Sequence, residues 1–164
     1  MSFSIQLLEE PVPQKMLEKG EKGVMGRIII GERSDPKALN ERIIIATNYW
    51  SPSDYIRQWM EALHMITDGP DNAKSALITE MYNPANPRWA IFWWPLYREK
   101  NSVYIHSQYL IDKDMRPLSI NLNKLYSYVD DRAKPTEGGD EVSEWEVSVD
   151  DMREFLDKLE AKFL

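Results

Sequence analysis

The chain has 164 residues, a hydrophobic fraction of 43% and a formal net charge of −7. This length and hydrophobic content suit one domain with a real core, so we expect residues 1–164 to form a single domain. The absence of cysteine excludes disulfides, thiolate metal ligands and cysteine nucleophiles. Residues 1–10 carry no export signal. The longest apolar run, near Trp89–Leu96, falls far short of the roughly 20 residues of a membrane span. We therefore expect a cytoplasmic protein.

The negative charge is concentrated near the end of the sequence. Residues 130–160 hold twelve acidic and four basic side chains, whereas residues 1–129 hold fifteen of each. An acidic surface repels nucleic acid and speeds the encounter with a basic partner. A solvated helix face that serves solubility is an equally good explanation of the same charges.

The first part of the chain predicts strands. Ser2–Leu8 alternates in part between polar and apolar residues, Val24–Ile30 ends at Gly31, and Arg42–Thr47 contains three consecutive isoleucines. Such β-branched runs favour strands that are buried on both faces. The prolines and glycines between the first two segments predict a loop.

A helix is expected directly after Ser51. Ser51 suits the N-cap, Pro52 the first helical position and Asp54 the N3 position of a capping box. Asp68-Gly69-Pro70 provides the stop signal. The apolar residues that recur at helical spacing, and so predict the buried face, are Tyr55, Ile56, Trp59, Met60, Leu63 and Ile66.

An antiparallel meander should follow this helix. Ser75–Tyr82, Arg88–Tyr97 and Val103–Ile111 are three predicted strands joined by short turns. Pro95 indicates an edge position or a bulge in the second strand. Alternation sends Trp93 and Trp94 to opposite faces. A sheet buried on both faces explains this best, and an aromatic surface for a partner is the alternative.

The last part of the chain predicts a helix over Leu122–Arg132, a strand over Val142–Val147 and a final helix capped by Ser148. The buried stripe of that helix comprises Val149, Met152, Phe155, Leu156, Leu159 and Phe163. The predicted fold class is therefore α+β, with a twisted, mainly antiparallel sheet and about three packed helices.

Signals for catalysis are weak. The only histidines, His64 and His106, fall on different predicted elements, and no Gly-x-Ser-x-Gly elbow occurs. The early glycines match neither dinucleotide nor P-loop spacing. The sequence therefore indicates a binding protein, not an enzyme, with no cofactor and no metal. A hydrolase that uses either histidine with a carboxylate stays an alternative.

Several segments from about Tyr49 to Trp145 together resemble the immunity proteins of contact-dependent growth inhibition systems, in the same order and at similar spacing. These segments are Tyr49-Trp50-Ser51, Asp54-Tyr55 with Trp59, Ser75-Ala76-Leu77, Met81-Tyr82, Trp94-Pro95-Leu96-Tyr97, Val103-Tyr104-Ile105, and Arg132 followed by Gly138-Gly139 and Ser143-Glu144-Trp145. The matched tryptophans are expected to be core residues, so the motif describes the fold more than the contacts.

The resemblance implies a bacterial cytoplasmic protein that binds the C-terminal toxin domain of a CdiA-type effector and covers its active site. In the most similar branch it implies a Whirly-like fold and an RNase as the toxin. The acidic region agrees with this, because a nuclease presents a basic face. The side chains expected to supply the toxin contacts are Asp130, Asp131, Glu137, Asp140, Glu141, Glu144 and Glu146. The alternative function is a Whirly-like protein that binds single-stranded nucleic acid through stacked aromatics, which the acidic balance disfavours.

Overall fold

The computed structural model describes residues 2–85, 90–111, 122–132 and 143–164. Its elements in chain order are β1 (Phe3–Pro11), α1 (Gln14–Glu18), β2 (Gly23–Ile30), β3 (Leu39–Ala46), α2 (Pro52–Thr67), β4 (Lys74–Met81), β5 (Ala90–Glu99), β6 (Ser102–Ile105), β7 (Gln108–Ile111), the 3₁₀ helix η2 (Leu122–Tyr128), β8 (Trp145–Ser148) and α3 (Val149–Phe163). The predicted α+β class with a mainly antiparallel sheet is confirmed.

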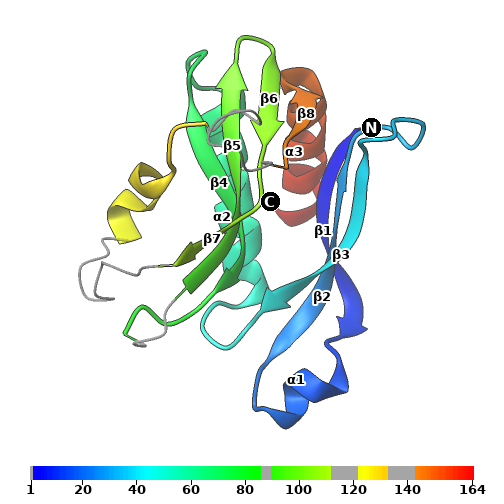
Figure 1. The fold of residues 1–164 in the computed structure, drawn as a ribbon, viewed down its shortest axis with the longest axis vertical. Coiled ribbons are helices and arrows are strands. Elements are labelled where there is room, and N and C mark those ends of the chain that lie inside the picture. The colour runs from blue at the N-terminus through cyan, green and yellow to red at the C-terminus, as the bar shows by residue number, and fades with distance from the viewer. Residues whose placement is uncertain (1, 86–89, 112–121, 133–142) are drawn as a thin grey trace.

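The strands form one sheet in the order β1-β2-β3-β4-β5-β6-β8, and β7 pairs with β5 beside this path. Every pairing is antiparallel except that of β3 with β4, which consists of the single parallel pair Ala46 and Glu80. The sheet is therefore two antiparallel parts that meet at one point. Figure 1 shows these parts side by side, with α2 and α3 behind β4, β5, β6 and β8.

The helix predicted after Ser51 forms as expected. The Asp54 backbone N–H donates to the Ser51 hydroxyl at 3.3 Å, and the Ser51 backbone N–H donates to the Asp54 carboxylate at 2.8 Å, which completes the capping box. The Trp59 ring donates to the carbonyl of Ile78 in β4 at 2.7 Å. The fully buried Tyr55 hydroxyl contacts the end of β3 and accepts from the N–H of Met81 in β4 at 2.9 Å. Helix α2 thus joins the two parts of the sheet at their single parallel pair.

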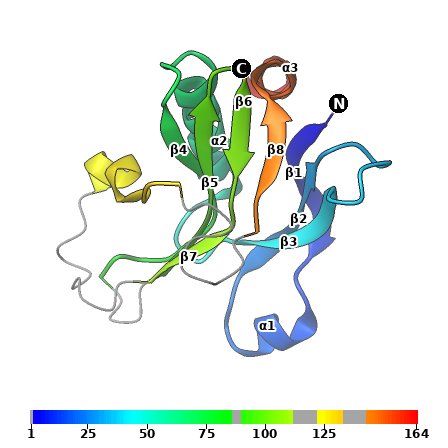
Figure 2. The same cartoon turned by 45° about the horizontal axis from the view of Figure 1, so that its top comes forward.

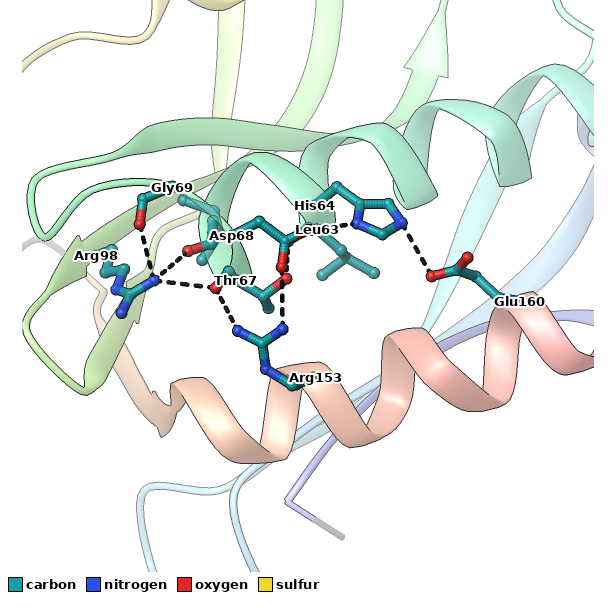
Figure 3. A network of polar contacts seen from close by, with 9 residues as sticks. Leu63, His64, Thr67, Asp68, Gly69, Arg98, Arg153 and Glu160 are labelled. Carbon is teal, nitrogen blue, oxygen red and sulfur yellow. Dashed lines mark hydrogen bonds and ion pairs between the residues drawn. The ribbon is translucent and has the colours of Figure 1, made fainter.

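A polar network connects the C-terminal end of α2 to α3 and β5 (Figure 3). Arg98 donates to three carbonyl oxygens there, at 3.0 to 3.1 Å. Arg153 of α3 donates to the Asp68 carboxylate at 3.0 Å, and His64 lies between Asp68 at 2.7 Å and Glu160 at 2.9 Å. The last carbonyls of a helix have no partner within the helix, so cations at this end satisfy them and suit the helix dipole.

The expectation for Pro95 is corrected by the sheet order. Strand β5 pairs with β4 on one side and with β6 and β7 on the other, so Pro95 does not lie in an edge strand. The bulge lies in β4, between Ile78 and Glu80, and not at Pro95. The single strand expected over Val103–Ile111 is interrupted between β6 and β7. Pro95 faces this interruption, where its missing N–H leaves no gap in the ladder and its carbonyl accepts from the N–H of His106 at 3.0 Å.

The helix expected over Leu122–Arg132 is also wrong in type and length, because the structure has the short 3₁₀ helix η2 there. Lys124 has φ of −120°, which breaks the turn, and only Leu125 and Val129 are buried in this stretch. An apolar stripe this short does not support a longer amphipathic helix. Helix α1, which the prolines and glycines concealed, follows Pro13.

Candidate functional site

The Glu144 side chain lies at the centre of an ion-pair network. Arg132 donates to both of its carboxylate oxygens, at 2.7 and 2.6 Å, and His106 Nε2 lies 2.7 Å from the same carboxylate. Arg132 also donates to Glu99 at 2.9 Å and stacks 3.5 Å from the ring centroid of Tyr104. A bidentate arginine pair of this kind is strong and directional. The network therefore joins the segment before β8 to β5 and β6.

The Glu144 carboxylate is committed to this network. Its side chain is 13% exposed. Burial alone raises the pKa of Glu144, but the hydrogen bonds from Arg132 and His106 outweigh that effect and hold the pKa below its usual value. Glu144 therefore stays ionised and paired, and its role is to position the chain entering β8.

A cleft of about 500 Å³ opens between β8 and the loop that joins β2 to β3. Figure 2 shows the strands around it, with β8 standing between β6 and the start of β1. Five carboxylates and one amine line this cleft. These charged residues are Glu32, Asp35, Glu144, Glu146, Asp151 and Lys37. The cleft is thus strongly acidic and is the surface of the molecule best suited to a cationic partner.

Local turn chemistry fixes the loop wall of the cleft. Gly31 has φ of +90°, a conformation that favours glycine, and its N–H donates to the carbonyl of Ser2 at 2.6 Å. The Asp35 side chain accepts from the N–H of Lys37 at 2.9 Å, which is an Asx turn. On the opposite wall, Ser102 donates to Glu146 at 2.9 Å. The positions of Asp35 and Glu146 are therefore held by neutral groups.

The outward-facing acids of the cleft lack internal cations. Among the described residues, Glu32, Asp35 and Glu146 form no ion pair with Lys or Arg, and all three are exposed. Lone carboxylates held together in a concave surface repel one another. A partner that brings cations relieves this repulsion, and at such a surface charge complementarity gives fast association.

The acids selected from the sequence fall in three places. Glu144 and Glu146 line the cleft. Asp130 and Asp131 are exposed beyond η2, and Asp131 pairs with Lys74 at 3.2 Å. The other three predicted acids, Glu137, Asp140 and Glu141, lie outside the described residues. The sequence reasoning did not select Glu32, Asp35 and Asp151, because it counted charge by region of the chain.

The aromatic strand does not provide a stacking surface within the part that the structure describes. Trp93 and Trp94 of β5 are 0% and 2% exposed. The matched tryptophans are structural to different degrees: Trp59 is fully buried, whereas Trp50 and Trp145 are half-buried and pack against the core. These observations speak against the single-stranded nucleic-acid alternative, since stacking needs accessible ring faces.

The two histidines face carboxylates, and neither belongs to a recognisable catalytic group. His64 contacts Asp68 and Glu160 on the helix surface, and His106 contacts Glu144 in the buried network. No cluster of three or more potential metal ligands occurs in residues 2–85, 90–111, 122–132 and 143–164. Among the helices that the structure describes, none has the length and apolar character to span a membrane.

The family model of the CdiI N-terminal domain matches residues 45–155, which run from the end of β3 into α3. The chain belongs to the CdiI family of immunity proteins. The matched residues of this CdiI protein include the Glu144 network and the β8 wall of the cleft, whereas the loop wall with Glu32 and Asp35 lies outside the match.

A solved structure agrees with this assignment. The CdiI protein superposes on a chain of the CdiA-CT/CdiI toxin and immunity complex from Enterobacter cloacae with a TM-score of 0.75 and 21% sequence identity. The match covers 97% of this chain and 99% of that chain, so the two share a fold along nearly their whole length. No curated protein matches the sequence.

Proposed function

We propose that this CdiI protein binds the C-terminal toxin domain of its cognate CdiA-type effector in the cytoplasm and neutralises it, with residues 1–164 acting as one domain. The acidic cleft between β8 and the β2–β3 loop carries this proposal, because it gathers carboxylates without internal cations on one concave surface. The family and the complex from Enterobacter cloacae support it.

The chemistry of the cleft favours a basic toxin, and a nuclease such as an RNase is the best fit. A nuclease active site concentrates cations for the phosphate backbone, and an acidic protein surface competes for the same cations. We propose that the toxin's active-site face docks on the cleft, with Glu146 as one of its contacts. Asp130, Asp131, Glu137, Asp140 and Glu141 belong to the same proposed contact set, while Glu144 shapes the wall.

Co-expression with the toxin domain of the neighbouring effector gene tests the proposal. We expect a complex that co-purifies, restored growth of cells that make the toxin, and an affinity that falls steeply between about 50 mM and 500 mM NaCl because screening weakens charge pairs. A toxin domain from an unrelated effector serves as the control and should neither bind nor be neutralised. Continued killing at equal expression would contradict the immunity role.

A second experiment addresses the manner of inhibition. Purified toxin is incubated with RNA and with increasing amounts of the CdiI protein, and cleavage is followed on gels. Covering of the active site predicts complete inhibition at one equivalent and loss of RNA binding by the toxin. A complex that still binds RNA would show instead that the CdiI protein docks away from the active site.

A further inference from the structure

Strand β8 ends the sheet path, and its outer side is an open edge. It pairs with β6 over four residue pairs, from Ser102 with Ser148 to Ile105 with Trp145. No described strand pairs with its other side. That side belongs to the cleft, whose lining includes all four residues of β8. An open edge of this kind is a template for an added strand.

The direction of the backbone groups follows from the ladder. The N–H of Val149 donates to the carbonyl of Asn101 at 2.8 Å, so the pair one step further that exchanges bonds with β6 is Val147 with Val103. The residues between them alternate, and the N–H and C=O of Glu146 therefore point away from β6, toward the cleft. The same holds for Ser148. The open edge thus presents backbone donors and acceptors at every second residue.

The charges around this edge select the occupant. Glu146 belongs to β8 itself and Asp151 to the first turn of α3, whereas Glu32 and Asp35 lie on the opposite wall. An extended segment in the cleft would pair its backbone with β8 and present alternate side chains to these carboxylates. Lysine or arginine at alternate positions satisfies both requirements.

We infer that β8 is the docking strand for the toxin, and that an extended, basic segment of the toxin domain adds to its open edge as a further strand of the sheet. This inference rests on the proposed function and specifies its contact. Because β8 rises about 3.3 Å per residue, its four residues pair with a segment of similar length. Backbone pairing supplies affinity, and the acids select for alternating cations.

Two variants of one residue separate the backbone contribution from the charge. Glu146→Ala removes the carboxylate and keeps the N–H, whereas Glu146→Pro removes both while leaving the bonds to β6 intact, since the Glu146 N–H points away from that strand. Proline is tolerated at such edge positions. By calorimetry with the purified toxin domain, we expect Glu146→Ala to weaken binding about 3- to 10-fold and Glu146→Pro to weaken it at least a further 10-fold.

Val147→Pro is the matched control for the fold, because the Val147 N–H points to β6 and its loss should lower the melting temperature clearly. Glu146→Pro should melt within a few degrees of the wild-type protein. Equal toxin affinity for Glu146→Ala and Glu146→Pro would overturn the inference. Wild-type binding would persist in that case, so the proposed function would stand.

Amide hydrogen exchange of the wild-type protein tests the same point without a variant. The amides of Glu146 and Ser148 should exchange rapidly in the free protein and slow at least 100-fold in the toxin complex, whereas Val147 should be protected in both. Unchanged exchange at Glu146 and Ser148 in a stable complex would overturn the added strand. Failure of the wild-type protein to bind the toxin at all would overturn both the inference and the proposed function.

Discussion

Two sets of carboxylates in this CdiI protein have opposite surroundings. Around Glu144 and at the end of α2, each carboxylate faces a cation: Arg132 for Glu144, Arg153 for Asp68. At the cleft, Glu32 and Glu146 have no such partner among the described residues. Similar side chains therefore hold the fold together in one region and are available to a partner in the other. Net charge counts both sets alike, whereas only the second adds to an interaction surface.

Charge reversal at the cleft should have the largest effect. The triple variant Glu32→Lys, Asp35→Lys and Glu146→Lys should weaken toxin binding about 1,000-fold, or about 4 kcal/mol, because like charges then face the basic partner. Its free energy of unfolding should change by less than about 0.5 kcal/mol, since these side chains form no internal ion pair. Calorimetry and urea unfolding measure the two quantities.

A control variant with the same change in charge uses three exposed acids that do not line the cleft. These substitutions are Glu9→Lys, Glu18→Lys and Asp157→Lys. The control should weaken binding less than about 10-fold, as expected for long-range steering alone. Equal losses for both triple variants would show that overall charge, and not the cleft, determines binding.

The paired region should respond in stability. Arg132→Met leaves the largely buried Glu144 carboxylate without its bidentate partner, which should cost about 2 to 3 kcal/mol of unfolding free energy. The comparison variant Glu99→Gln removes the exposed partner of the same arginine and should cost less than about 1 kcal/mol. Urea unfolding monitored by tryptophan fluorescence distinguishes them, and equal values would refute the distinction between buried and exposed pairs.

A smaller loss is expected at the end of α2. Arg98→Met removes the donor to three carbonyl oxygens and should destabilise the protein by about 1 to 2 kcal/mol, because part of the lost bonding is recovered by water. Arg57 is exposed on the same helix, so Arg57→Met should change stability by less than about 0.5 kcal/mol. Thermal unfolding of the two variants at one pH provides the check.

The smallest effect should be a pH dependence from His64. Its hydrogen bond to Asp68, followed by the charge of Glu160, raises the pKa of His64 above the ordinary 6.5. A group whose pKa is raised on folding stabilises the protein fully below its unfolded pKa and loses that contribution as pH rises through the folded pKa. The stability difference between the wild type and His64→Gln should therefore shrink between about pH 6 and pH 9.

The size of this difference should stay below about 1 kcal/mol, because His64 is half-exposed and solvent screens its ion pairs. Unfolding in urea at both pH values measures it, and NMR titration of the His64 ring locates the pKa directly. A difference that grows with pH would contradict the bridging role of the imidazolium.

Local signals in the sequence were sufficient for the helices with caps and for the meander. Ser51 with Asp54 and Ser148 with Asp151 define the starts of α2 and α3 through contacts three residues apart, so neighbouring residues alone determine them. The helix expected beyond Leu122 failed because its apolar stripe is short. The interruption opposite Pro95 depends on the neighbouring strand, which the sequence does not reveal. The Whirly-type likeness of the sheet stays a prediction.

The candidate site was only half predictable. Glu146 was selected from the acidic region and does line the cleft, whereas Glu32 and Asp35 lie in a stretch with balanced charge. They belong to the site because the β2–β3 loop folds next to β8, which is a relation across more than 100 residues. Glu144 was selected for its charge, but the structure shows it bound to Arg132, a pairing that no spacing rule indicates.

The contact between the first strand and the last helix has a consequence for how the protein is made. Phe3 of β1 packs edge-on against Phe155 of α3, with ring centroids 5.4 Å apart, and Ser2 donates to Asp151, 149 residues away. A ribosome releases β1 long before it has translated α3, so a nascent chain keeps the Phe3 ring without its final partner. Contacts this distant in sequence slow folding. Protection of a newly dividing cell therefore draws on finished molecules inherited from its parent, since those still in synthesis have not yet closed.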